Sequence, residues 1–180
     1  MSEPLSLYVK LKITKEKLDQ FFLQCPLPLK VDAEWQQWWD GREMYNKEEL
    51  RELPAYGSPN YRTVIQELLD EPRFAAAESY DETTQTWTLL VLYFSENYTE
   101  SLPMLSLLKH LGSDVKGGDD NVALLYDFLW GNGSVMAYIE YTGQRAVLTN
   151  YSETAELAPA VMAAADAALE ALCQRLQAAE

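Results

Sequence analysis

Alternation of apolar and polar residues predicts strands in several parts of the chain. In residues 5–13, LSLYVKLKI, every second side chain is aliphatic, whereas the residues between them are mostly polar. Successive side chains of a strand point to opposite faces, so this stretch is expected to bury one face and leave the other wet. Residues 86–94, TWTLLVLYF, are apolar almost throughout, which is typical of a central strand covered on both faces. Residues 74–79, which precede it, are predicted to form the strand that pairs with it in a hairpin.

Residues 121–150 hold the clearest pattern and predict three antiparallel strands joined by tight turns. Asn132-Gly133 favours a two-residue type I′ turn, because both positions of that turn need positive φ. The turn creates one apolar face from four cross-strand pairs, Trp130–Val135, Phe128–Ala137, Tyr126–Ile139 and Leu124–Tyr141. A second turn at Thr142-Gly143 sets Glu140 opposite Arg145, and a turn one residue later sets Glu140 opposite Val147. The opposite charges favour the first register.

Helical spacing of apolar residues, together with capping residues and breakers, predicts the helices. Thr14 is an N-cap, and the helix that follows it stops at Cys25-Pro26. Further helices are expected at 33–40, 47–53 and 61–70, from Thr99 or Ser101 to Gly112, and at 153–179, where the composition is rich in alanine.

The order of these elements predicts an α+β fold. The sheet is expected to be antiparallel or mixed, with about six strands and helices mainly on one face. Its core follows the βαββαβ order of ferredoxin-like domains. The chain of 180 residues suits a single domain, 1–180, with an aromatic-rich insertion at about 32–60. A different α+β topology built from the same elements is the alternative.

The net charge of −14 narrows the classes of partner. Phosphate contacts are made by Lys and Arg, so neither nucleic acid nor an anionic membrane is an expected partner. A basic protein is the partner that such a charge attracts. Residues 121–180 carry two basic residues against seven acidic ones, so the excess is uneven along the chain. The simpler interpretation is a soluble protein with an acidic surface.

The two cysteines and the lack of a long apolar run indicate the cellular compartment of the protein. Cys25 and Cys173 lie far apart in sequence and form no CxxC, which favours a reducing environment. The first residues, MSEPLSLYVKLKI, do not resemble a signal peptide, and there is no apolar run long enough to span a bilayer. The expected location is the cytoplasm.

The sequence offers few residues for catalysis, and we predict no catalytic residue, metal or cofactor. His110 is the single histidine and falls in the last turn of an expected helix, where an imidazole suits the helix dipole. The glycine-bearing loops match no phosphate-binding motif. Asp127 is expected on the wet face of its strand beside Tyr138, the alternative being that a helix covers it.

Two groups of residues are the candidate partner-binding site. The first is the aromatic insertion, with Trp35, Trp38, Trp39 and Tyr45, because Trp and Tyr dominate interface hot spots. The alternative is that these tryptophans pack on the sheet as a second core. The other group is the mixed face of the three-stranded segment, with Asp127, Tyr138, Glu140 and Arg145.

Three functional hypotheses follow. The first is an acidic cytoplasmic inhibitor without enzymatic activity, similar to bacterial immunity proteins or antitoxins, whose carboxylates cover the active site of a basic toxin such as a nuclease. The second is a small-ligand-binding protein or enzyme that uses a pocket between the sheet and the aromatic insertion. The third is a structural or assembly subunit that pairs through the last helix.

Overall fold

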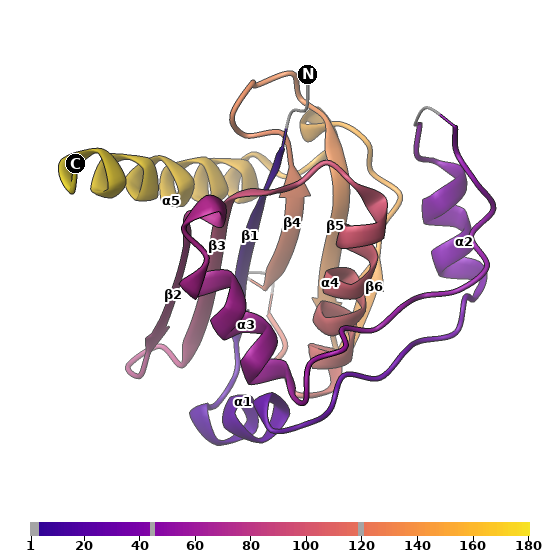
Figure 1. The fold of residues 1–180 in the computed structure, drawn as a ribbon, viewed down its shortest axis with the longest axis horizontal. Helices are drawn as coiled ribbons and strands as arrows, with labels where there is room; N and C mark the ends of the chain where they lie inside the picture. The colour runs from indigo at the N-terminus through magenta and orange to yellow at the C-terminus, as the bar shows by residue number, and fades with distance from the viewer. Residues whose placement is uncertain (1–3, 44–45, 119–120) are drawn as a thin grey trace.

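A six-stranded antiparallel sheet forms the centre of the computed structural model, which describes residues 4–43, 46–118 and 121–180. The strand order is β2-β3-β1-β4-β5-β6 (Figure 1). The strands are β1 (Leu5–Lys12), β2 (Ala76–Asp81), β3 (Thr86–Ser95), β4 (Val122–Tyr126), β5 (Val135–Thr142) and β6 (Arg145–Leu148). The α+β prediction is confirmed. The order of the first four strands is compatible with a ferredoxin-like core, to which β5 and β6 add a further hairpin.

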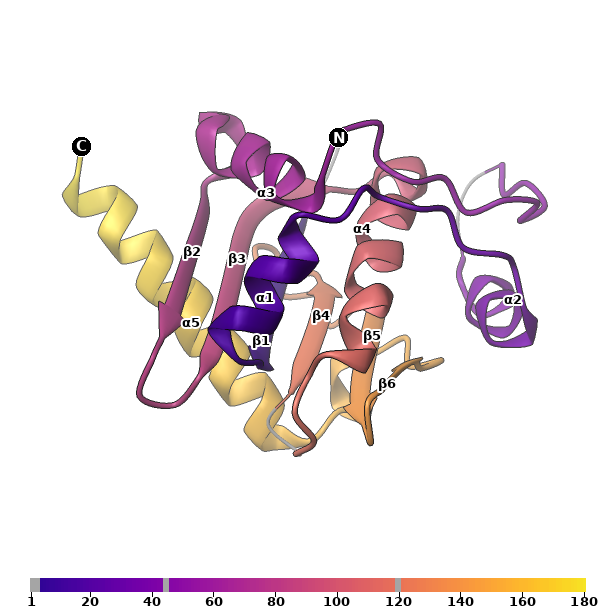
Figure 2. The same cartoon turned by 90° about the horizontal axis from the view of Figure 1, so that it is seen from below.

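Helices cover both faces of the sheet and divide the molecule into three layers (Figure 2). The helices are α1 (Lys15–Phe22), α2 (Ala33–Asp40), α3 (Tyr61–Asp70), α4 (Tyr98–His110) and α5 (Pro159–Ala178). Helices α1, α3 and α4 lie on one face, α2 stands beside β6, and α5 crosses the opposite face (Figures 1 and 2).

Side-chain caps fix where several helices begin. Asp32 accepts a hydrogen bond from the Trp35 amide at 2.9 Å, and Asn60 accepts one from the Thr63 amide at 2.8 Å. Each cap satisfies a backbone N–H that lacks a partner inside the helix. Both helices, α2 and α3, therefore have the bounds expected from the sequence.

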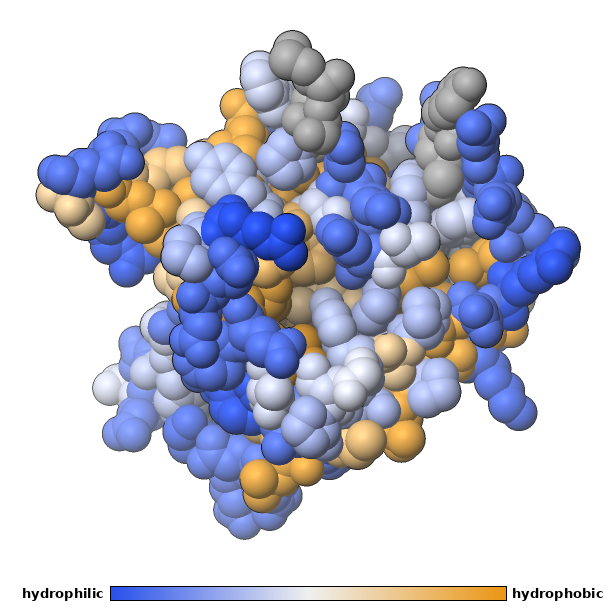
Figure 3. All heavy atoms as spheres, in the orientation of Figure 1, coloured by the Kyte–Doolittle hydropathy of each residue, from blue (hydrophilic) through white to orange (hydrophobic). Residues whose placement is uncertain are grey.

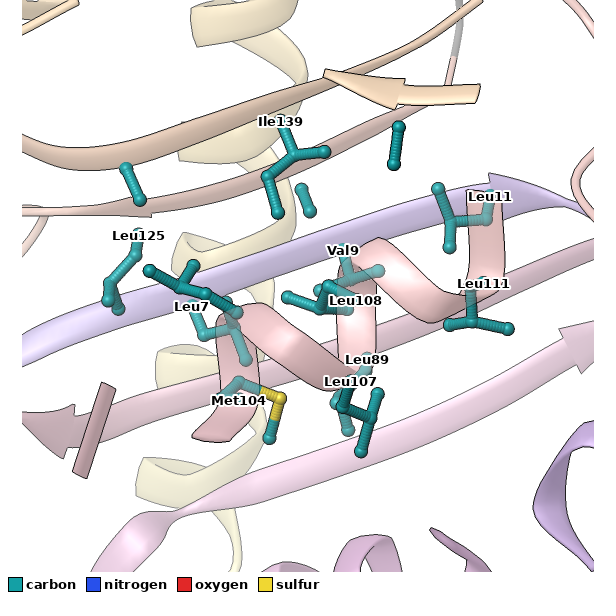
Figure 4. Close-up of a cluster of buried hydrophobic side chains, with 14 of the residues drawn as sticks. Leu7, Val9, Leu11, Leu89, Met104, Leu107, Leu108, Leu111, Leu125 and Ile139 are labelled. Carbon is teal, nitrogen blue, oxygen red and sulfur yellow. The ribbon is translucent and has the colours of Figure 1, made fainter. Parts of the chain in front are cut away.

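The larger core lies between the sheet and helices α1 to α4. Alternate residues of β1, among them Leu7 and Val9, meet Leu107 and Leu108 of α4 there (Figure 4). The other face of β1 was expected to be wet, and that expectation is wrong at Ser6 and Tyr8, which are buried. A second core beneath α5 contains Tyr8.

Helix α5 closes this second core with one stripe of its surface. Ala165, Leu169 and Leu172 are buried against apolar residues of β1, β3, β4 and β5. The helix starts at Pro159 and not at Glu153, because residues 154–156 form a separate turn of 3₁₀ helix and residues 157–158 are extended. Pro159 then occupies the first helical position, where a missing N–H costs nothing.

The register expected for β4 and β5 is wrong. Leu124 pairs with Tyr138 and not with Tyr141, and Tyr126 pairs with Val135 after a bulge. Strand β4 ends at Tyr126, so residues 127–134 form a longer connection, which we call the β4–β5 loop. Asn132-Gly133 belongs to this loop and does not form a two-residue hairpin turn.

The turn between β5 and β6 adopts the alternative register. Thr142 pairs with Arg145, and Glu140 pairs with Val147, so the expected Glu140–Arg145 pair is absent. Gly143 and Gln144 are the two turn residues, with φ of 52° and 65°. Two successive positive φ values are what a type I′ turn requires, and they place the turn one residue later than the opposite charges suggested.

The helix expected at 47–53 is also absent, since residues 47–53 have an extended or irregular backbone. Leu50 and Leu53 are buried, and Leu53 forms an isolated antiparallel bridge with Leu29. The leucines that suggested a helix thus contribute to the main core from an irregular segment.

Helix α2 is attached to the edge of the sheet through Glu34. Its carboxylate Oε1 accepts a hydrogen bond from the Leu148 amide of β6 at 2.6 Å. The same oxygen accepts one from Lys109 Nζ at 2.6 Å, and Arg145 lies 3.7 Å from Oε2. One carboxylate therefore joins α2, α4 and β6.

Candidate functional site

The three tryptophans of the insertion are buried, as the alternative interpretation of this segment expected. Trp38 donates its indole N–H to the Met136 carbonyl at 2.9 Å, and Trp39 donates to the Glu48 carbonyl at 2.9 Å. Trp35 and Trp38 pack edge to face with ring centroids 5.9 Å apart. Their rings belong to the main core and offer little surface to a partner. Tyr45 lies outside the described residues.

Arg42, which the sequence did not single out, anchors the insertion just after α2. The side chain is 4% exposed and lies over the Trp38 ring. Its guanidinium donates to backbone carbonyls of Trp38, Val135, Met136, Asn150 and Tyr151, at 2.8–3.2 Å. Burial lowers the pKa of Arg42, with opposing contributions from Tyr98 and Glu156. The cation thus fixes the insertion to β5 and to the segment after β6.

Asp127 is not on a wet strand face, because it is the first residue of the β4–β5 loop and is 4% exposed. One carboxylate oxygen accepts from the Trp130 amide at 3.0 Å, and the other accepts from the Asn132 amide at 3.1 Å. Its own amide donates to the Ser134 carbonyl at 3.0 Å. Asp127 therefore sets the conformation of the whole loop.

The other three residues of the expected mixed face do not converge on one point. Tyr138 is buried, and burial together with Glu140 and Tyr151 raises its pKa to about 12. Glu140 is half-buried on the same side of β5. Arg145 is exposed at the β5–β6 turn, at the opposite end of β5 from Asp127.

A hollow of about 540 Å³ lies between the β4–β5 loop and α5, and we call it the α5 hollow. It is lined by Tyr126, Asp127, Phe128, Gly131, Gly133, Thr154, Met162, Asp166, Ala167 and Glu170. These residues include carboxylates and apolar side chains but no Lys or Arg. The Tyr126 hydroxyl donates to Asp166 Oδ1 at 2.7 Å. Burial and this acceptor raise the pKa of Tyr126 well above its usual range.

Trp130 stands in the sequence between Phe128 and Gly131, which both line the α5 hollow, and it is 61% exposed. A single exposed apolar side chain is ordinary on a protein surface, so the exposure of Trp130 points to a contact only together with the hollow that its chain neighbours line. The sequence pattern placed Trp130 inside a strand facing a core, so its exposure was not foreseen. The one signal of the loop in the sequence is Asp127, an acidic residue in an otherwise apolar strand pattern.

A second hollow, of about 460 Å³, lies where the insertion meets the sheet. It is lined from the insertion by Gly41, Arg42 and Glu43, and from the opposite side by residues that include Tyr98, Ser134 and Met136. The Arg42 guanidinium is already engaged with backbone carbonyls here.

No family model matches this chain. The curated proteins and the solved structures likewise yield no match to its sequence or its fold.

The residues weighed for other chemistry have ordinary surroundings. His110 Nε2 lies 3.1 Å from the Leu27 carbonyl. Cys25 is exposed, whereas Cys173 is half-buried and burial raises its pKa. Within residues 4–43, 46–118 and 121–180, no His, Cys, Asp or Glu cluster is placed to hold a metal ion. None of the helices in these ranges has the length and apolarity to cross a membrane.

Proposed function

We propose that this chain is an acidic protein-binding domain that neutralises a basic partner. The concrete form of the proposal is an inhibitor similar to immunity proteins or antitoxins, which covers the active site of a basic toxin such as a nuclease. The observation that carries it is the distribution of charge around α5. Residues 121–180 contain only Arg145 and Arg175 as basic residues, and the carboxylates of Asp166 and Glu170 are exposed.

The physical argument is electrostatic complementarity. A nuclease cleft carries Lys and Arg that contact phosphates, and exposed carboxylates present similar charge to those groups. A net charge of −14 also steers a basic protein toward this surface before contact, which raises the association rate. Steering of this kind weakens as salt screens the charges.

The test begins with the purified chain as bait in a lysate of its source organism at low salt. We expect one basic protein to bind, to elute as salt is raised, and to lose its own enzymatic activity when one equivalent of the chain is added. The control is an unrelated acidic protein of equal net charge, which should not inhibit. A partner that binds but keeps full activity would contradict inhibition, and the absence of any basic partner would contradict the function.

A second candidate function is supported by the 460 Å³ hollow between the insertion and the sheet. Its volume falls in the range typical of small-molecule sites, and its lining combines Arg42, Glu43 and Tyr98 with serine hydroxyls. A polar metabolite bound there should raise the melting temperature of the chain in a thermal-shift screen. Ser134→Trp, which fills the hollow, should abolish that rise. A screen of polar metabolites without any rise would rule this function out.

A further inference from the structure

We propose that the α5 hollow and Trp130 form the docking site for an arginine or lysine side chain of the basic partner. This inference rests on the proposed function. It specifies where on the chain the partner binds and which residues contact it. The basic side chain would enter the hollow while the Trp130 ring covers the neighbouring partner surface.

The lining of the hollow suits a long cationic side chain. Asp166 and Glu170 are four residues apart on α5, so they lie on the same side of the helix, about 6 Å apart at their Cβ atoms. Phe128 and Met162 line part of the hollow with apolar side chains. The stem of Arg or Lys packs on apolar surface while its charged head reaches carboxylates. Because the lining holds no basic side chain, the carboxylates have no competing cation within the hollow.

Trp130 has the properties of an interface anchor. It combines large exposed ring area with a fixed backbone, because its amide donates to the buried Asp127 carboxylate. Gly131 and Gly133 stand on either side of Asn132 with φ of 69° and 82°, values that glycine adopts without strain. A loop held in one conformation loses less entropy on binding than a loose loop does. Tryptophan and arginine are also the residues that most often dominate interface energetics.

Figure 3 shows hydrophilic residues over much of the face bearing α3 and α4, with apolar residues in smaller groups, some of them along α5 and others near the lower and right-hand edges of the view. The other four tryptophans, Trp35, Trp38, Trp39 and Trp87, are buried. Trp130 is therefore the one tryptophan of the chain whose ring a partner can reach directly, and also a natural optical probe of the site.

The probe for the test is a ten-residue peptide of alternating Arg and Gly, labelled with fluorescein, and binding to the full chain is followed by anisotropy. We expect saturable binding that weakens with salt, accompanied by a change in Trp130 fluorescence. Trp130→Ala and Glu170→Lys should each lower the affinity about tenfold. The matched controls are Tyr93→Ala and Glu82→Lys, which alter an exposed aromatic and an exposed acidic residue outside the hollow, and we expect less than a twofold effect from them.

The outcomes separate this site from the proposed function. If all four variants bind the peptide equally, or the controls weaken binding as much as the site variants do, the α5 hollow is not the docking site and the general function stands. If the wild-type chain fails to bind the peptide even at low salt, both proposals are overturned. A peptide with Glu in place of Arg must not bind, since binding of it would show that charge plays no part.

Discussion

Arg42 is a buried cation whose hydrogen bonds, among the residues that the structure describes, all go to carbonyl oxygens. Each of its hydrogen bonds joins the insertion to a segment nearly a hundred residues or more away, apart from the one to Trp38. A guanidinium can do this because its donors form a rigid planar fork, which an ammonium group lacks. The stability of the insertion therefore depends in part on this side chain, beside the contacts of Glu34 and Trp38.

Arg42→Ala is expected to lower the free energy of unfolding by roughly 3 kcal/mol, because several buried carbonyls lose a charged donor at once. Urea denaturation followed by tryptophan fluorescence measures the change. Arg51→Ala is the control, since the Arg51 side chain is 82% exposed and its pairing with Glu49 is weak. Equal stability of the two variants would show that the Arg42 hydrogen bonds contribute nothing net.

Sequence reasoning could not find Arg42 or the role of Asp127, and the reason is the same for both. Their partners are backbone atoms, which carry no signature in the sequence. The pattern around Asp127 resembled an uninterrupted strand leading to Asn132-Gly133, a dipeptide with strong turn preference. Two hydrogen bonds from loop amides to the Asp127 carboxylate outweigh that preference. Local propensity was overridden by a side chain five residues away.

At the scale of elements, the 3₁₀ turn that follows α4, Leu111–Ser113, comes very close to β6 at Gly112. A Cβ placed on Gly112 would lie 2.6 Å from the Ala146 amide nitrogen and 2.8 Å from its Cβ. Both distances are shorter than van der Waals contact, so the helix end and the strand can approach this closely only where a side chain is missing.

Gly112→Ala is expected to destabilise the fold by about 2 kcal/mol, because backbone must move to accept the new methyl group. The change is measured as a shift in the urea midpoint. Gly57→Ala serves as the control, since a Cβ at Gly57 meets nothing within 4 Å. A Gly112→Ala protein as stable as Gly57→Ala would mean that α4 and β6 can separate freely.

Helix α5 offers a matched pair of leucines for a second prediction. Leu169 is 0% exposed against the sheet, whereas Leu176, two turns further along, is 40% exposed. Leu169→Ala should cost about 3 kcal/mol of stability through lost burial and the cavity that remains. Leu176→Ala should cost well under half of that. Thermal unfolding followed by circular dichroism compares them, and equal losses would contradict the docking of α5 described above.

How well a helix or strand could be predicted depended on whether nearby or distant residues determine it. The bounds of α2 and α3 follow from local caps and periodicity, so they could be read from Asp32 and Asn60. Residues 47–53 show leucine spacing that fits a helix, but Leu53 pairs with Leu29 instead. The wet face expected for β1 is covered by α5, a helix more than 140 residues away in sequence. Contacts over such separations cannot be inferred from alternation alone.

For the whole molecule, buried tyrosines link stability to alkaline pH. The pKa of Tyr138 is raised to about 12, and burial raises that of Tyr141 further. A folded state that holds the proton more tightly than the unfolded chain gains stability below the unfolded pKa near 10, and loses it as pH rises through the folded pKa.

Unfolding free energy is therefore expected to be level from about pH 8 to 10 and to fall between about pH 10 and 12, by roughly 3 kcal/mol from Tyr138 alone. Urea titrations at several pH values measure this, while absorbance at 295 nm reports tyrosinate. Tyr138→Phe should have a smaller fall over the same range. A stability that stays constant up to pH 12 would refute the coupling.

The Glu34 carboxylate has a consequence for the synthesis of the chain. It is bonded to the Leu148 amide, 114 residues later, at the outer edge of β6. Unpaired strand edges invite pairing with other chains, and a side-chain acceptor at this edge occupies one of the positions such pairing would use. On the ribosome, however, α2 emerges long before β6 does. Until β6 emerges, the nascent chain is expected to expose the Trp35 and Trp38 rings, which makes chaperone binding to the growing chain most important in that interval.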